Sequence, residues 1–140
     1  MKQKLQMLAT ILRQKSNELN LFSAGDRDKL ESKHIPDSLA VMGFWQIEDG
    51  AKVLDLGSGG GIPGLPLAIS LPGVNFTLSD ARQKKMDAMY DIKRELKLDN
   101  VTVVSGRFEE LAHLPDFREK FDMVTARAVA PLPVLLEYVA

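Results

Sequence analysis

An aspartate followed by three glycines, each spaced two residues apart, carries the most informative chemistry in this 140-residue chain. These residues form the pattern D-x-G-x-G-x-G from Asp55 to Gly61. Glycine tolerates positive φ and has no Cβ, so a strand can turn sharply here and a ligand can approach the backbone closely. The apolar run before the glycines, residues 53–56, is typical of a buried strand. The sequence therefore predicts a ligand-binding loop at the carboxyl end of a strand, where open α/β sheets bind their ligands.

The same stretch fits two classes of adenosine-containing cofactor. Gly59, Gly61 and Gly64 match G-x-G-x-x-G, the dinucleotide fingerprint, but a glycine-rich stretch fits several frames. The frame that starts at Asp55 is the first motif of Rossmann-like methyltransferases, in which the acid can organise the loop amides and the methionine ammonium of the cofactor. A dinucleotide fold needs no acid inside its first strand, so we prefer the methyltransferase interpretation. A loop without a ligand is the least favoured alternative, because glycine is costly to order.

A second carboxylate, Asp80, ends the next apolar run, residues 76–79. At the end of a strand it can accept hydrogen bonds from both ribose hydroxyls of an adenosine cofactor. The alternative is an N-terminal cap for the helix that follows, since Asp is a favoured capping residue. Its strand position and its spacing from Gly57 favour the ribose role.

The elements that position these residues alternate between strand and helix. Four apolar runs predict strands, at residues 53–56, 76–79, 101–104 and 121–125. The stretches between them predict helices, at residues 65–70, 84–96 and, as a helix or turn, 109–114. Crossovers of this length imply parallel strands with helices on both faces, which is an α/β Rossmann-like fold.

The first 45 residues predict a helical extension in front of this fold. Residues 2–19 have the spacing of an amphipathic helix, residues 20–27 are expected to form a loop, and residues 28–42 a helix that Pro36 interrupts or kinks. We therefore expect an N-terminal helical extension at 1–45 and a Rossmann-like cofactor-binding domain at 46–140.

Composition excludes several classes of function. The chain has no cysteine, which removes a disulfide framework, a cysteine zinc site and a cysteine nucleophile. For metals, we expect no metal partner. There is also no apolar run near 18 residues and no recognisable secretory signal, so we expect a cytoplasmic protein without a membrane partner. The net charge of −1 argues mildly against tight autonomous RNA binding. The basic stretch at residues 82–97 is either a solvated helix face or a phosphate-contacting surface.

Five segments occur in an order that resembles one family. They are LESKHIPDSLA, VLDLGSGGGIPGLPLAI, FTLSDARQKK, VVSGRFEE and FDMVTARAVAPLPVLLE. Together they resemble the RsmG (glucose-inhibited division protein B) family of small-subunit rRNA guanine-N7 methyltransferases. The resemblance implies an enzyme that uses S-adenosyl-L-methionine to methylate N7 of a guanine in 16S rRNA, free or in the small ribosomal subunit. We expect it to be a monomer.

Carried over residue by residue, the resemblance implies cofactor contacts from Gly57, Ile62, Phe108, Glu109 and Arg127. An apolar side chain and a backbone amide at Phe108 and Glu109 can receive an adenine ring, although Phe108 can equally belong to the core. The Arg127 guanidinium can hold the methionine carboxylate or an RNA phosphate, and the alternative is a surface ion pair.

The resemblance also places His34 and Asp37 near the cofactor mouth, where they can touch cofactor or RNA. For His34 a local capping role is equally open. We name no catalytic base, because guanine N7 has its own lone pair and can attack the sulfonium methyl when it is correctly aligned.

Two alternatives stay open. The sequence ends one predicted helix, residues 133–139, after the fourth strand, whereas the family's sheet has seven strands. We therefore expect a chain that lacks its C-terminal strands, and one alternative is a truncated, inactive cofactor-binding fragment. The other is a nicotinamide-dependent Rossmann enzyme, against which the Asp55 frame and the RAVA segment both argue.

Overall fold

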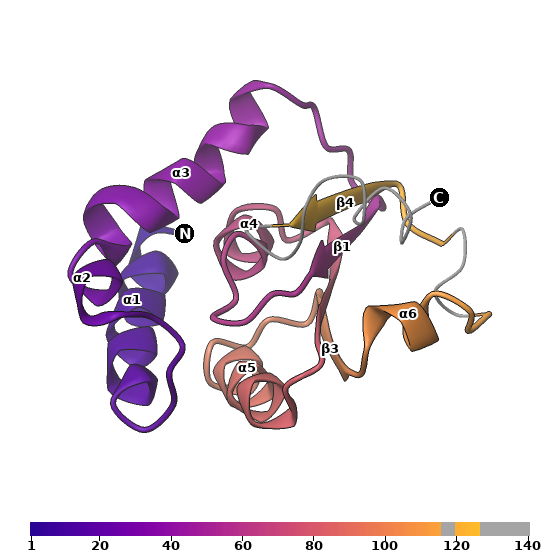
Figure 1. Ribbon diagram of the computed structural model, residues 1–140. Helices are drawn as coiled ribbons and strands as arrows, with labels where there is room; N and C mark the ends of the chain where they lie inside the picture. The colour runs from indigo at the N-terminus through magenta and orange to yellow at the C-terminus, as the bar shows by residue number, and fades with distance from the viewer. Residues whose placement is uncertain (116–119, 127–140) are drawn as a thin grey trace.

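The computed structural model describes residues 1–115 and 120–126, and a four-stranded parallel sheet lies at its centre (Figure 1). Its strands are β1 (Lys52–Leu56), β2 (Asn75–Asp80), β3 (Val101–Ser105) and β4 (Met123–Ala126). They stand in the order β3-β2-β1-β4, so the chain moves outward from β1 to β3 and then returns to the other side of β1. The predicted parallel α/β sheet is confirmed, and the bounds of each strand differ from the predicted bounds by at most two residues.

Helices cover both sides of the sheet, as predicted. They are α4 (Gly64–Ser70) after β1, α5 (Gln83–Glu95) after β2 and α6 (Phe108–Leu111) after β3. Figure 1 shows α4 and α5 on one side and α6 on the other. Pro66 is tolerated in α4 because it lies in the first turn, where a backbone N–H has no partner within the helix.

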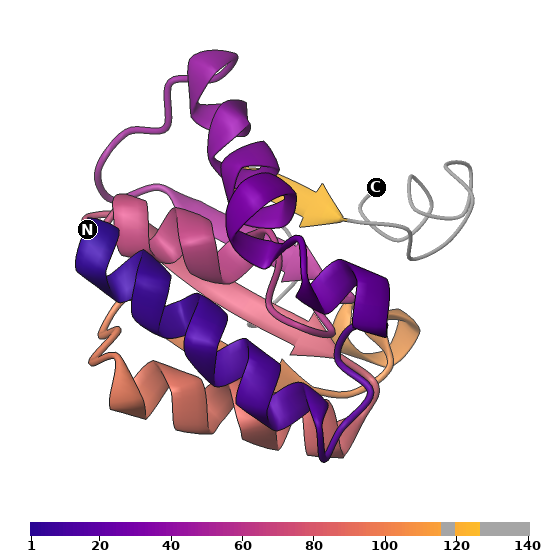
Figure 2. The same cartoon turned by 90° about the vertical axis from the view of Figure 1, so that its left-hand side faces the viewer.

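The N-terminal residues form a further helical layer outside α4 and α5. Its first helix, α1 (Lys2–Ser16), contacts both of them and runs across their outer side in Figure 2. Leu8 and Leu12 of α1 are fully buried in the same hydrophobic cluster as Val53 of β1 and Phe76 of β2. Each such leucine contributes about 1.5–3 kcal/mol on burial, so the extension and the sheet share one core.

The segment after α1 differs from its prediction in two places. Residues 20–27 were expected to be a loop, but the last four form the short helix α2 (Ala24–Arg27), which Ser23 caps by accepting a hydrogen bond from the amide of Asp26 at 3.2 Å. The signal was present, since Ser is a preferred N-cap.

The helix predicted at residues 28–42 is not continuous, and its type changes directly before Pro36. A π-helical turn, η1 (Leu30–His34), leads directly into α3 (Ile35–Ala40), and a 3-10 turn, η2 (Val41–Gly43), ends the segment. Pro36 lies in the first turn of α3, where its missing N–H costs no helical hydrogen bond.

None of the helices in the described residues has both the length and the apolar character needed to cross a lipid bilayer. Residues 133–139, where a further helix was predicted, lie outside the described residues.

The packing of α4 on the sheet gives a testable prediction at Gly64. A Cβ at this position would overlap the side chains of Leu78 and Asp55, both buried in the sheet. We expect Gly64→Ala to lower the free energy of unfolding by about 1–3 kcal/mol, the usual cost of overpacking a core. Urea unfolding followed by circular dichroism measures this change.

Gly25→Ala is the matched control, because Gly25 lies in α2 with no atom within 4 Å of the added Cβ. Alanine is the better helix former, so this variant should be as stable as the wild type or slightly more stable. Equal stability of the Gly64→Ala variant and the wild type would contradict the tight packing of α4.

Candidate functional site

The glycine loop leaves the carboxyl end of β1, at the point where the strand order reverses. Gly57, Gly59 and Gly61 have φ angles of 66°, 51° and 80°, in the left-handed region that strains other residues. These are the three glycines of the D-x-G-x-G-x-G pattern. Gly64 is not among the positive-φ residues, and close packing accounts for it instead. All three glycines of the frame that starts at Asp55 thus have positive φ, and the close packing of Gly64 is a feature that the third glycine of the dinucleotide frame would also show.

Asp55 ties the far end of this loop to the sheet. Its side chain is buried, and Oδ2 accepts a hydrogen bond from the amide of Gly64 at 2.9 Å. The hydroxyl of Thr125, on the neighbouring strand β4, lies 3.3 Å from Oδ1. The carboxylate thus links β1, β4 and the first turn of α4, whereas its predicted contact with a methionine ammonium stays a prediction.

Asp80 ties the near half of the loop to β2. Oδ2 accepts hydrogen bonds from the amide of Gly59 at 2.9 Å and from Nη2 of Arg82 at 2.7 Å. Oδ1 accepts from the amide of Arg82 at 3.0 Å and from its Nε at 2.8 Å. Arg82 is the residue that precedes α5, so Asp80 also stabilises the start of that helix. The N-cap of α5 is Arg82 and no side chain caps this helix, so the alternative role of Asp80 as the N-terminal cap is wrong, and its ribose role stays a prediction.

The charges around Asp80 alter its acidity. Burial raises the pKa of its carboxyl group, but the hydrogen bonds and the charge of Arg82, with the amide of Gly59, outweigh burial and leave the pKa below its usual value. The same contact raises the pKa of Arg82. Burial and repulsion from Arg82 lower the pKa of the nearby Lys85. This edge of the sheet therefore combines one buried carboxylate with two cations.

A pocket of about 300 Å³ brings the loop together with the N-terminal extension. Three predicted cofactor residues of the loop line it, namely Gly57, Gly59 and Ile62. His34 of the extension and Arg82 line it as well. The pocket thus joins residues from three parts of the chain at the carboxyl edge of the sheet, where ligands of open α/β sheets bind.

Phe22 holds the extension against the loop. A Cβ at Gly60 would overlap the Phe22 ring, so this glycine allows the aromatic ring to lie directly on the backbone. The Phe22 ring also stacks on His34, with 6.4 Å between the ring centroids. His34 is buried, and its Nε2 lies 3.1 Å from Oδ1 of Asp26. Sequence reasoning missed Phe22 and Asp26. The only local signal was an additional glycine at position 60, outside the D-x-G-x-G-x-G positions, which allows a close approach to the backbone.

The other predicted residues lie outside this pocket. Asp37 is exposed on α3, and Phe108 and Glu109, at the start of α6, are not among the described residues that line it. The amide of Gly106, two residues before Phe108, donates to the carbonyl of Asp80 at 3.0 Å, which keeps α6 beside the end of β2. Arg127 lies outside the described residues.

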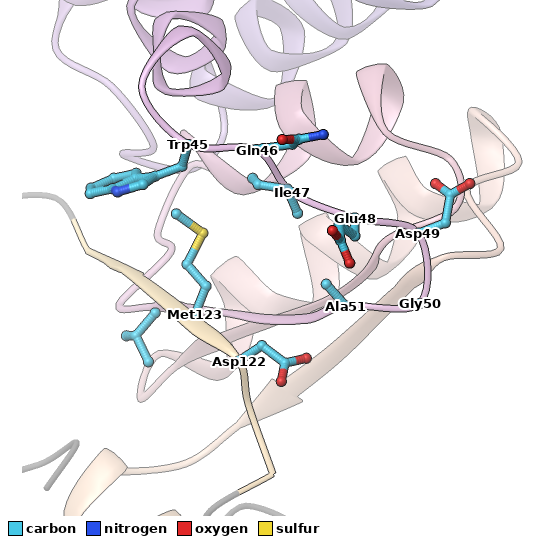
Figure 3. Close-up of a pocket in the computed structure, with 10 residues that line it drawn as sticks. Trp45, Gln46, Ile47, Glu48, Asp49, Gly50, Ala51, Asp122 and Met123 are labelled. Carbon is cyan, nitrogen blue, oxygen red and sulfur yellow. The ribbon is translucent and has the colours of Figure 1, made fainter.

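A second, larger pocket of about 650 Å³ lies at the opposite edge of the sheet (Figure 3). It is lined by residues 45–51, which lead into β1, and by residues 122–124 at the start of β4. It contains none of the predicted site residues that the structure describes. Because parallel sheets bind ligands at their carboxyl edge, we assign the site to the smaller pocket.

The lowered pKa of Asp80 predicts an acid-sensitive contribution to stability. A carboxyl group with a lower pKa in the folded protein stabilises it above the unfolded-state pKa, and this contribution is lost as the pH falls below roughly 4. The wild type should therefore be more stable than the Asp80→Asn variant at pH 7, and the difference should shrink towards pH 3. Urea unfolding across this range measures it, and a difference that does not change with pH would contradict the ion pair.

Comparisons with known proteins show the family of the chain. The family model of GidB, described as rRNA small subunit methyltransferase G, matches residues 1–140. The ribosomal RNA small subunit methyltransferase G of Caldanaerobacter subterraneus subsp. tengcongensis is 41% identical over 133 residues, which cover 95% of this chain and 56% of the relative. That of Desulfitobacterium hafniense is 42% identical over 136 residues, covering 97% and 56%. The chain spans just over half the length of these curated relatives.

Among solved structures, coclaurine N-methyltransferase bound to N-methylheliamine and SAH matches with a TM-score of 0.64 and 21% identity. The match covers 88% of this chain and 40% of that chain, and at this identity it shows the fold alone. The shared fold is a Rossmann-like α/β fold. By the family model and by these curated relatives, the chain belongs to the family of rRNA small subunit methyltransferase G.

Proposed function

We propose that this protein binds S-adenosyl-L-methionine and transfers its methyl group to N7 of a guanine in 16S rRNA. The observation that carries the proposal is the glycine loop, which two buried carboxylates hold at the switch point of the sheet. Membership of the rRNA small subunit methyltransferase G family supports the RNA substrate. SAH bound to the coclaurine N-methyltransferase of the same fold supports the cofactor.

The residues of the loop fit an adenosine cofactor. Gly57 and Gly59 line the pocket and have no side chain that would keep a ligand from the backbone, whereas Gly61 makes room for Leu65 and Met89 of the core. The buried carboxylate of Asp80 lies beside Gly59. In the proposed arrangement Asp80 holds the ribose and Asp55 holds the loop and the methionine ammonium. Ile62 lines the pocket next to the glycines.

The remaining cofactor contacts are proposals from the family resemblance. Phe108 and Glu109 would receive the adenine ring beside the end of β3, and Arg127 would bind the methionine carboxylate or an RNA phosphate. On the acceptor side we propose His34 and Asp37. His34 is the better supported of the two, because it lines the pocket with the glycine loop.

The chemistry asked of the protein is binding and alignment. S-adenosyl-L-methionine supplies a methyl group on a positively charged sulfur. Guanine N7 carries a lone pair and needs no deprotonation, so we assign no catalytic base or acid. Holding both reactants in line can account for a large part of the rate, since effective molarities reach about 10⁵–10⁸ M in well-oriented reactions.

The protein's setting is proposed with the same reasoning. We propose that it works in the cytoplasm as a monomer and without a metal, on free 16S rRNA or on the small ribosomal subunit. We further propose that the chain consists of a helical extension at 1–45 and a cofactor-binding domain at 46–140. The common core means that the two parts are expected to fold together.

The proposal predicts methylation of a defined atom. Small ribosomal subunits that lack the modification, incubated with the protein and radiolabelled S-adenosyl-L-methionine, should gain label at one guanine. Borohydride reduction and aniline should then cleave the RNA there, because the sequence of treatments is selective for 7-methylguanine. The Arg127→Ala variant should lose most of this transfer while its unfolding midpoint stays close to that of the wild type.

Label on a different base, or on an exocyclic amine that resists aniline cleavage, would refute the N7 assignment. Full transfer by the Arg127→Ala variant would remove Arg127 from the site.

A further inference from the structure

The buried carboxylate at the end of β2 is already fully occupied by the protein. Arg82 donates through Nε to Oδ1 of Asp80 at 2.8 Å and through Nη2 to Oδ2 at 2.7 Å. The backbone amides of Arg82 and Gly59 donate one further hydrogen bond to each of these oxygens. A carboxylate has about four lone-pair positions. These four hydrogen bonds fill them, so Asp80 has no acceptor position left for another donor.

A ribose diol would ask for the same two positions as the arginine. It offers two adjacent O–H donors to the two carboxylate oxygens, and the guanidinium fork offers two parallel N–H donors to them. The backbone amides of Gly59 and Arg82 belong to the loop and to the start of α5, so they cannot leave without unfolding these elements. The side chain of Arg82 is therefore the donor that must give way.

The exposed fractions of Asp80 and Arg82 also indicate that Arg82 is the side chain that moves. The side chain of Asp80 is 4% exposed and that of Arg82 is 57% exposed, so the carboxylate is fixed and the arginine is free to swing into solvent. Nη2 of Arg82 lies 3.4 Å from the position that a Cβ on Gly59 would take. The guanidinium thus covers the glycine backbone as well as the carboxylate.

We propose that Arg82 determines the affinity of the cofactor site, because its guanidinium takes the place of the ribose diol until the cofactor displaces it. This inference rests on the proposed function of Asp80 as the ribose acceptor. Displacement breaks an ion pair to a buried carboxylate, and this loss offsets part of the binding free energy. Removing the fork should therefore strengthen cofactor binding, whereas removing most residues of a binding site weakens it.

Calorimetric titration of the chain with S-adenosylhomocysteine tests this directly. The Arg82→Met variant keeps an unbranched apolar stem and removes all donors of the side chain, and it should bind at least about threefold more tightly than the wild type, given the usual strength of partly exposed ion pairs. Arg82→Leu, which also has no side-chain donor, serves the same purpose if the methionine variant does not fold.

Arg13 provides a matched control. It forms the same two-pronged pair with Glu31, at 2.6 and 2.7 Å, and it does not line the glycine-loop pocket. The Arg13→Met variant should therefore bind S-adenosylhomocysteine with the affinity of the wild type. This control separates the loss of a fork at Asp80 from the general effect of losing an arginine–carboxylate pair.

A second ligand distinguishes competition between Arg82 and the ribose hydroxyls from a general increase in the mobility of the glycine loop. The increase in affinity caused by Arg82→Met should be greater for S-adenosylhomocysteine than for its 2′-deoxy analogue, which presents only one of the two hydroxyls. An equal gain for both ligands would overturn the proposal, as would unchanged or weaker binding of S-adenosylhomocysteine by the variant. If neither the folded wild type nor any variant binds S-adenosylhomocysteine, the proposed cofactor function itself fails and this inference falls with it.

Discussion

The site depends on two buried carboxylates that hold a glycine-rich loop from opposite ends. Asp55, on β1, accepts from the amide of Gly64, and Asp80, on β2, accepts from the amide of Gly59. Burying a carboxylate is costly, and hydrogen bonds from backbone amides offset that cost because they are charge-assisted. The same bonds place a loop of positive-φ glycines at the switch point of the sheet, so the constraint that stabilises the loop also prepares it for a ligand.

The helical extension belongs to this arrangement through its packing. Leu8 and Leu12 of α1 are buried in the core, against which α1 packs from outside α4 and α5. Phe22 lies on the backbone of Gly60. Through its stacking on Phe22, His34 is held at the wall of the pocket. The helical extension therefore contributes to the wall of the glycine-loop pocket as well as to the core.

The strands, the loop and the two carboxylates could be predicted because their signals are local: apolar runs, glycine spacing, and an acid at or next to the ends of β1 and β2. The residues that were missed depend on contacts between distant segments. Phe22 and Asp26 reach the site only because the segment around α2 packs on the loop, and nothing in the local sequence distinguishes Arg82 from the other cations near its helix. Pro36 marks the place where a π-helical turn gives way to α3, but the sequence does not show which type of helix precedes it.

The most direct test of the account is an amide and indole NMR titration of the chain with S-adenosylhomocysteine, with NAD as the competing ligand. The account predicts that the largest shifts occur at Gly57, Gly59 and Gly61, and that the indole of Trp45, the single tryptophan and a wall of the second pocket, does not move. Shifts at Trp45 with an unchanged glycine loop, or shifts of the loop with NAD alone, would contradict the assignment of the cofactor site.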